Sequence, residues 1–378
     1  MTASNTLIPV QTRDERRAST NPDDFADVTG REYEWHLSPV EKLNDLFVAE
    51  LSNPENPFDV TSTGPVSYSW ISMNDAAVGL AGKPEEKPAA RAWDQTGNAF
   101  LVDIAADDVS EVTLERSSLT QQASTAHTVI RVAPFAKTTV VLRNSGTASL
   151  IENVEIVAGE SSSVTLVSVQ EWAADARHLA THFVTAGRCA SVKHVVVTLS
   201  GEIVRLNTQA RLSGAGSSVE LLGLYFADAG EHLEHQVFVD HIAEQTKSRV
   251  TYKGALQGQG ARTVWIGDVL IGAQATGTDS YEQNRNLVLT DGTRADSIPN
   301  LEIKTGDIAG AGHASATGRF DDDQLFYLQA RGISEEEARQ LVVRGFLNEV
   351  VQQIGIPHVE EHIQAALDRE LEAVGVGG

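Results

Sequence analysis

The feature that most constrains the fold of this chain is a long, proline-free region with a period of two. No proline occurs between Pro134 and Pro299. Proline lacks the backbone N–H that a strand donates to its neighbour, so this region can form central strands. The alternation is clearest over residues 204–212, where one face carries Val204, Leu206, Thr208, Ala210 and Leu212 and the other carries Arg205, Asn207, Gln209 and Arg211.

Similar short runs recur from about residue 90 to residue 305, often separated by glycine-containing turn signals. Ten or more short strands in series predict one large all-β unit. A β-solenoid accommodates such a series naturally, and we find no fixed-length repeat of the kind that propellers show. We therefore expect a mainly β protein with a parallel β-helix core whose open ends need covering. The runs are Thr128–Val132, Thr138–Leu142, Val164–Val169, His194–Leu199, Val219–Phe226, His235–Val239, Arg249–Tyr252, Val264–Leu270 and Asn286–Leu289.

Both ends of the chain have helical signals. Eight of the 11 prolines precede residue 90, and Ser38-Pro39-Val40-Glu41 predicts a capping box ahead of an N-terminal helix. After Gly318 we expect three helices: one over residues 321–331, one begun by a capping box at Ser334 to Glu337, and a last one after Pro357. The pattern predicts an N-terminal segment over residues 1–90, a β-helix over 91–318 and a helical unit over 319–378.

Composition excludes several classes of protein. The 29 Lys and Arg against 52 Asp and Glu give a net charge of −23, which argues against an extended nucleic-acid or anionic-membrane surface. The single cysteine, Cys189, cannot form an internal disulfide or a multi-cysteine metal site. No long apolar run or leader-like segment is visible, so we expect a soluble, cytoplasmic protein.

Most residues that could carry chemistry have an ordinary structural explanation. There is no P-loop, so any nucleotide chemistry must come from another chain. His235 and His241 would lie about 20 Å apart on a strand, too far to share a metal. His178 and His182 also share a face, and we read all four as ordinary strand histidines. We expect Cys189 to be a small buried side chain.

Two features remain open from the residues alone. The acidic residues could serve a carbohydrate-cleaving β-helix enzyme: Asp103, Asp107, Asp108 and Asp321 to Asp323. Helix starts favour such charges in any case. His313 lies among small residues in Gly310 to Gly318, which leaves its imidazole open to a ligand.

Several ordered motifs between Glu244 and Ile333 resemble the SufB/SufD family of iron–sulfur cluster assembly scaffolds. The matching pieces are Thr246 to Leu256, Asp279 to Leu289, Ala295 to Ile303 and His313 to Gly318, followed by Arg319, Asp321-Asp322, Leu325 to Leu328 and Arg331 to Ile333. The shorter length and the absence of cysteines at the family's ligand positions place the resemblance on the SufD side. Where SufD-type chains often carry a cysteine two residues before the histidine, this chain has Ala311.

The resemblance implies a non-catalytic scaffold subunit with a β-helix core. It implies pairing with a SufB-like chain and binding of the SufC-like ATPase by the C-terminal helices, starting near Leu325, Phe326, Tyr327 and Leu328. His313 would be a ligand for iron or a transient cluster at the interface between the scaffold chains. Clusters prefer thiolates, so the thiolates would come from the partner, and the isolated chain would hold no cluster.

Overall fold

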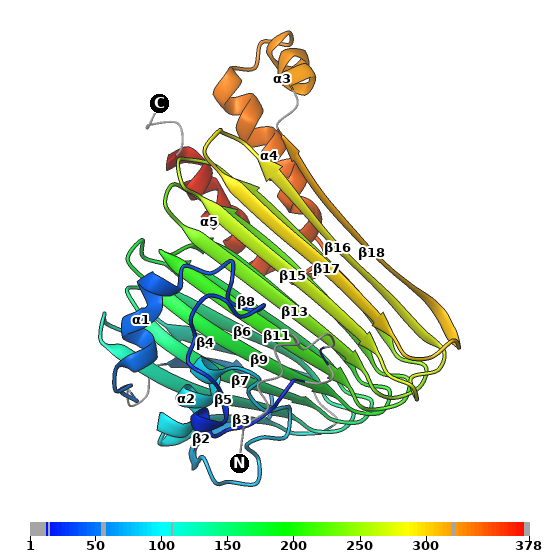
Figure 1. Ribbon diagram of the computed structural model, residues 1–378. Helices are drawn as coiled ribbons and strands as arrows, with labels where there is room; N and C mark the ends of the chain where they lie inside the picture. Colours follow the sequence, from blue (N-terminus) through cyan, green and yellow to red (C-terminus); the bar gives the residue numbers. More distant parts are fainter. Residues whose placement is uncertain (1–12, 14–15, 54–57, 107–108, 320–321, 374–378) are drawn as a thin grey trace, which may run out of the picture.

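The computed structural model describes residues 13, 16–53, 58–106, 109–319 and 322–373. Its strands form two nine-stranded sheets (Figure 1). Sheet A has the order β17-β15-β13-β11-β9-β7-β5-β3-β2, and sheet B has the order β1-β4-β6-β8-β10-β12-β14-β16-β18. The strands are β1 Asp59–Thr63, β2 Val66–Ser72, β3 Asn98–Ile104, β4 Val109–Arg116, β5 Ala123–Val132, β6 Lys137–Gly146, β7 Ser149–Ala158, β8 Ser163–Trp172, β9 Arg177–Ala186, β10 Ser191–Ser200, β11 Ile203–Leu212, β12 Ser218–Ala227, β13 His232–His241, β14 Lys247–Leu256, β15 Arg262–Ile271, β16 Thr278–Val288, β17 Arg294–Ile303 and β18 Ile308–Arg319.

From β3 to β18 the chain alternates between the two sheets and every pairing is parallel, which confirms the expected β-helix, with about eight turns. The turns differ in length. Ala123 pairs with Ser149, 26 residues further on, whereas Arg262 pairs with Arg294, 32 residues further on. Because the corner loops vary while the strands stay nearly constant, the sequence has no fixed-length repeat.

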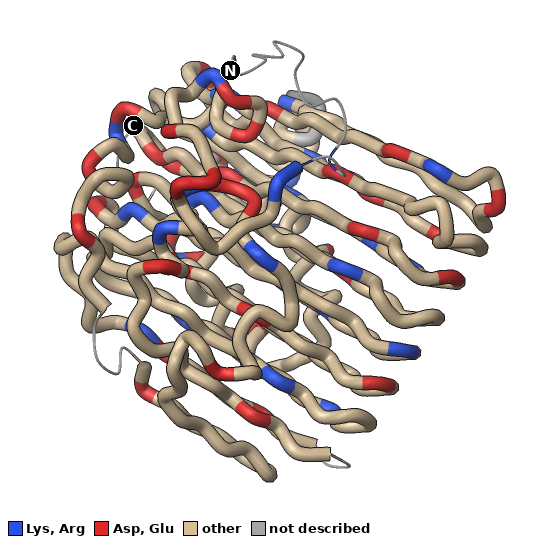
Figure 2. The backbone as a smooth tube through the Cα atoms, turned by 60° about the horizontal axis from the view of Figure 1, so that its bottom comes forward, with Lys and Arg blue, Asp and Glu red and all other residues tan. Residues whose placement is uncertain are grey.

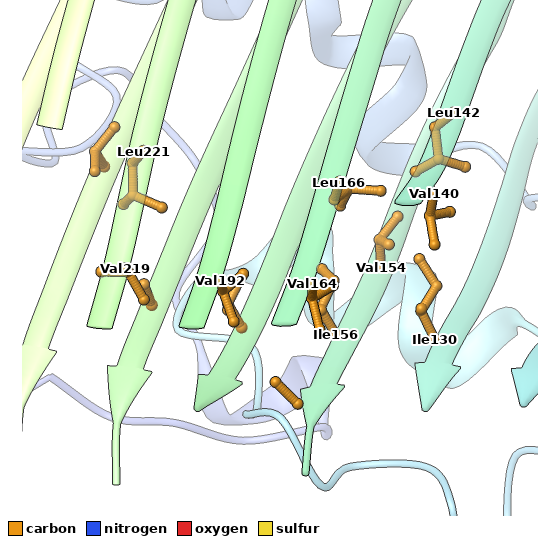
Figure 3. Packing of buried hydrophobic residues seen from close by; sticks show 14 of the residues in the cluster. Ile130, Val140, Leu142, Val154, Ile156, Val164, Leu166, Val192, Val219 and Leu221 are labelled. Carbon is orange, nitrogen blue, oxygen red and sulfur yellow. The ribbon is translucent and has the colours of Figure 1, made fainter. Parts of the chain in front are cut away.

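The core lies between the inner faces of the two sheets. Figure 3 shows valine, leucine and isoleucine side chains from successive strands stacked there, including Ile130, Val140 and Leu166. Parallel in-register pairing places like side chains above one another, so one continuous hydrophobic column runs through the solenoid. Removing these side chains from water is the main term that stabilises the fold.

The outer faces of both sheets are covered as well. Helices α1 (Val40–Val48) and α2 (Lys87–Gln95) pack on sheet A, where Leu43 and Leu46 join a separate hydrophobic cluster. Helices α4 (Glu335–Val351) and α5 (Pro357–Ala373) pack on sheet B. The polar face of β11 is therefore buried under the N-terminal segment instead of facing solvent.

Arg205 on β11 links this N-terminal segment to the solenoid. Its guanidinium contacts Glu86 at 2.7 Å and Glu234 at 3.0 Å, and it lies 3.7 Å from the ring centre of Trp35. Burial alone would lower the pKa of Arg205, but the two carboxylates outweigh it and raise that pKa. Burial likewise opposes ionisation of Glu234, yet Arg205 brings the pKa of Glu234 down to about 2.

The expected capping box at Ser38 is wrong. Helix α1 begins at Val40 after Pro39, and no side chain caps it. Ser38 lies one residue before the N-cap position, which Pro39 occupies, and its hydroxyl donates to Glu234 Oε2 at 2.7 Å.

The C-terminal helices follow the expected pattern. Helix α3 spans Asp322–Gln329, and Gly332, at φ +86, ends the turn that follows it. Ser334 and Glu337 form the expected capping box of α4. Helix α3 contacts α4 and projects beyond the strand ends (Figure 1). The proposed domain boundaries at residues 90 and 318 stay predictions.

Figure 2 shows acidic and basic residues along successive strands and at their turns, with both signs interleaved. None of the described helices combines the length and the hydrophobicity that crossing a bilayer requires.

Candidate functional site at the open end of the solenoid

The two ends of the solenoid differ. At the N-terminal end β1 and β2 pair antiparallel with β4 and β3, so the parallel stacking stops there. At the C-terminal end β17 and β18 continue the parallel stack and are the last strands of their sheets. Most of their residues are half-buried or exposed. This end therefore leaves two strand edges and part of the solenoid interior uncovered by the described residues.

His313 lies on β18, at this open end. It is in register with Glu282 of β16 and its side chain is 42% exposed. Its Nδ1 atom lies 3.8 Å from Glu282 Oε1, which is longer than a hydrogen bond. Its neighbours Gly312 and Ala314 are small, so the imidazole is accessible from the open side.

The Glu282 carboxylate is the most unusual group at this end. Its side chain is only 1% exposed, and neither oxygen has a hydrogen-bond partner in the part of the chain that the structure describes. Burial, and then repulsion from the Asp268 carboxylate, raise the pKa of Glu282 to about 8. Buried carboxylates without a partner are rare in native proteins, so this group marks a candidate site.

The inner face of β16 is polar beyond Glu282 as well. Asn284 Nδ2 donates to Tyr225 Oη at 2.8 Å, and Tyr225 Oη donates to Asn286 Oδ1 at 2.7 Å. Ser297 Oγ of β17 donates to Asn284 Oδ1 at 2.6 Å. These side chains satisfy one another, so the network orders the last turns of the solenoid and leaves Glu282 as the unpartnered member of its row.

Comparison with known proteins shows which family this chain belongs to. Residues 114–346 match the model of the SUF system FeS cluster assembly SufBD core domain, which covers more than half of the chain. The chain belongs to the SufBD family. It is 44% identical over 365 residues to an iron–sulfur cluster assembly SufBD family protein of Mycobacterium bovis, covering 94% of this chain and 92% of the relative. A Mycobacterium leprae relative of the same description is 43% identical over 94% of this chain and 93% of its own.

A second kind of relative is more distant. Another SufBD family protein of Mycobacterium leprae is 26% identical over 223 residues, which are 59% of this chain and 25% of that relative. Two SufBD family proteins of different size therefore resemble this chain in the same organism.

Sequence reasoning placed His313 in the SufBD family motif but missed Glu282. A signal was present, because Glu282 and Asn284 are polar where the preceding strand of the sheet, β14, carries Val250 and Tyr252 inward. The period of two alone could not tell which face of β16 points inward. Only the parallel register sets Glu282 beside His313.

The four expected partner-binding residues lie on α3. Leu325 is buried, Leu328 is half-buried, and Phe326 and Tyr327 are 73% and 55% exposed. Two neighbouring exposed aromatic rings on a short helix form an apolar surface, as a docking site for another protein requires.

The four other candidate histidines each contact a side chain of the protein. His178 contacts Glu152 at 2.8 Å, His182 contacts His194 at 2.9 Å, and His235 contacts Thr198 at 2.9 Å. His241 contacts Thr246 at 2.7 Å. Within the described ranges no group of three or more His, Cys, Asp or Glu is placed to hold a metal. The interpretation of these residues as strand histidines is confirmed.

The expectation that Cys189 is buried is wrong. Cys189 is exposed in the corner between β9 and β10, with a left-handed φ of +53. The residue lies between the strands and not at an inward-facing strand position, so its side chain stays outside the core.

The acidic candidates for a carbohydrate-cleaving site do not form one where the structure describes them. Arg131 donates to both oxygens of Asp103, at 2.8 and 2.7 Å, and that hydrogen bonding lowers the pKa of Asp103. Asp107, Asp108 and Asp321 lie outside the described residues. Asp322 and Asp323 belong to the first turn of α3.

Proposed function

We propose that this chain is a SufD-type, non-catalytic scaffold subunit of the iron–sulfur cluster assembly system. The observation that carries the proposal is the open end of the solenoid. There β17 and β18 are the last strands of their sheets, and His313 lies on β18. A partner with the same fold could continue both sheets and enclose His313 between the two chains.

Three roles follow for this chain's own residues. The edges of β17 and β18 would pair with a SufB-like chain. Helix α3, with Phe326 and Tyr327 outermost, would dock a SufC-like ATPase. His313 would offer a neutral imidazole nitrogen to iron or to a cluster in transit, with thiolates supplied by the partner, because the chain's one cysteine lies on a distant corner loop. Assembly would take place in the cytoplasm and would not involve nucleic acid or a membrane.

Co-expression with SufB-like and SufC-like proteins should yield one complex on affinity purification and size-exclusion chromatography. The double variant F326A/Y327A should lose the ATPase and retain the SufB-like chain, because these exposed rings lie on α3 and not on the strand edges. Val48→Ala is the matched control, since Val48 is 72% exposed on α1. A monomer that binds neither partner would contradict the proposal.

Replacing His313 with alanine should leave the complex intact and lower cluster assembly in cells by about tenfold or more, the loss expected for removal of a metal ligand or its support. The readout is the activity of an iron–sulfur enzyme in a strain that depends on this complex. His36→Ala serves as the control because His36 is exposed on the N-terminal segment. Normal assembly by the His313 variant would remove His313 from the site.

A further inference from the structure

The Glu282 carboxylate is buried and has no hydrogen-bond partner among the described residues. It is almost completely buried, and neither of its oxygens accepts a hydrogen bond from any described residue. A buried carboxylate without a donor or a cation costs several kcal/mol in order of magnitude, so proteins seldom retain one without a use. In the chain alone a proton can neutralise the group, and a cation from outside the chain is a partner that could replace this proton.

The packing around Glu282 holds the carboxylate in place without satisfying it. A Cβ atom on Gly267 of β15 would lie 2.6 Å from Glu282 Oε2 and 2.4 Å from the Trp265 ring, so only glycine leaves room there. The indole Nε1 of Trp265 also lacks a described partner. The Asp268 carboxylate, which is paired with Arg13 at 2.9 Å, is the charged group that acts on Glu282. Because carboxylate oxygens accept hydrogen bonds and do not donate them, they suit a cation and not an anion.

The nearest group that could share a cation is His313. Its Nδ1 lies 3.8 Å from Glu282 Oε1, too far for a hydrogen bond and less than twice a metal–ligand bond of about 2.1 Å. One ion could therefore contact both atoms. The exposed side of His313 faces the open end, which provides an entry path from solvent or from a partner.

We propose that Glu282 and His313 together bind one divalent transition-metal ion, and that in the cell this ion is ferrous iron on its way to a cluster. This deepens the proposed function and rests on it for the identity of the metal. A carboxylate oxygen and an imidazole nitrogen suit Fe²⁺ as a free ion, whereas an assembled cluster prefers thiolates. No third described ligand residue completes the set, so water or the partner chain supplies the remaining ligands.

Anaerobic titration of the full chain with Co²⁺, followed by its visible d–d bands and by EPR, tests the pair directly. The wild-type chain should bind about one Co²⁺ in a site of oxygen and nitrogen ligands. Glu282→Gln and His313→Ala should each weaken binding by about tenfold or more, as loss of one ligand from a small set predicts. The same titration is repeated on the complex with the SufB-like chain, where affinity should rise.

Glu111→Gln is the matched control, because Glu111 forms a carboxylate–histidine contact of 3.0 Å with His358 on the surface. It should bind Co²⁺ like the wild type. Thermal unfolding by circular dichroism shows that each variant is folded. Glutamine has the shape of glutamate without its charge, so E282Q should unfold no earlier than the wild type.

Two results would overturn the inference: Co²⁺ affinity that E282Q leaves unchanged, or no Co²⁺ binding by the wild-type chain both alone and in the complex. Either could occur while the complex forms and H313A impairs assembly, and the proposed function would then survive. Conversely, Co²⁺ binding that needs Glu282 in a chain that joins no complex would retain the metal site and refute the scaffold function.

Discussion

Replacing Arg205 with methionine should lower the free energy of unfolding by about 3–5 kcal/mol, the cost of leaving buried carboxylates without their cation. Glu86 and Glu234 both contact the Arg205 guanidinium, and all three side chains are almost fully buried. Methionine retains most of the volume but none of the charge. Urea unfolding at neutral pH, followed by circular dichroism, measures the change.

The matched control for R205M is Arg211→Met. Arg211 lies on the same face of the same strand, but its contact with Glu85 is 3.5 Å long and the side chain is 30% exposed. Partly exposed ion pairs contribute little, so R211M should cost less than about 1 kcal/mol. Adding E86Q and E234Q to R205M should restore part of the loss. An R205M variant as stable as R211M would show that the ion cluster does not anchor the N-terminal segment.

Stability should fall steeply with acid below about pH 6.5. Burial lowers the pKa of His182 to about 4, that of His235 to about 3 and that of His241 to about 4. Burial, and then His182 itself, also lower the pKa of His194 well below its ordinary value. Above pH 6.5 these rings are neutral in both states. As pH falls below it, the unfolded chain takes up protons that the folded chain cannot, so stability is lost.

The size of the effect follows from counting protons. Each additional proton on the unfolded chain costs about 1.4 kcal/mol per pH unit, so four histidines contribute about 5 kcal/mol per unit. Glu231 and Glu282 oppose this change, because burial raises the pKa of Glu231 to about 7 and that of Glu282 to about 8. They stay protonated when folded and ionise when unfolded, which offsets about half. The net slope between pH 6 and 5 should be about 3 kcal/mol per unit.

A single substitution isolates one of these protons. His194→Gln should reduce the slope by about 1.4 kcal/mol per pH unit, whatever its effect on stability at neutral pH. The titratable and charged groups that act on the His182–His194 pair are Glu152, His178 and Arg116, and all stay in place in this variant. His36→Gln, on the exposed N-terminal segment, is the control for loss of an imidazole at the surface. If the stability of H194Q and of the wild type depended equally on pH, then His194 would take up its proton in the folded chain as readily as in the unfolded chain.

Of the two residues in the candidate site, the sequence alone predicted His313 but not Glu282. His313 stands out locally, because a single imidazole among glycine and alanine residues is visible in one short motif. Glu282 precedes it by a whole turn of the solenoid, and only the pairing of β16 with β18 brings the two together. The length of the connecting turn sets that pairing. Since turn lengths vary along the solenoid, the partner of His313 could not be found by counting residues.

Local periodicity determined the class of fold and the placement of α1 and of the three C-terminal helices, but it did not predict α2 or the short strands β1 and β2. A period of two without proline specifies strands, and capping residues and a period of 3.6 specify helices, because both depend on neighbours within a few residues. The tertiary structure decided which polar residues are buried. Arg205 and Ser38 find their partners across the packed N-terminal segment, and Glu282 remains without one at the open end. Those outcomes depend on distant segments of the chain, and local pattern carries no information about them.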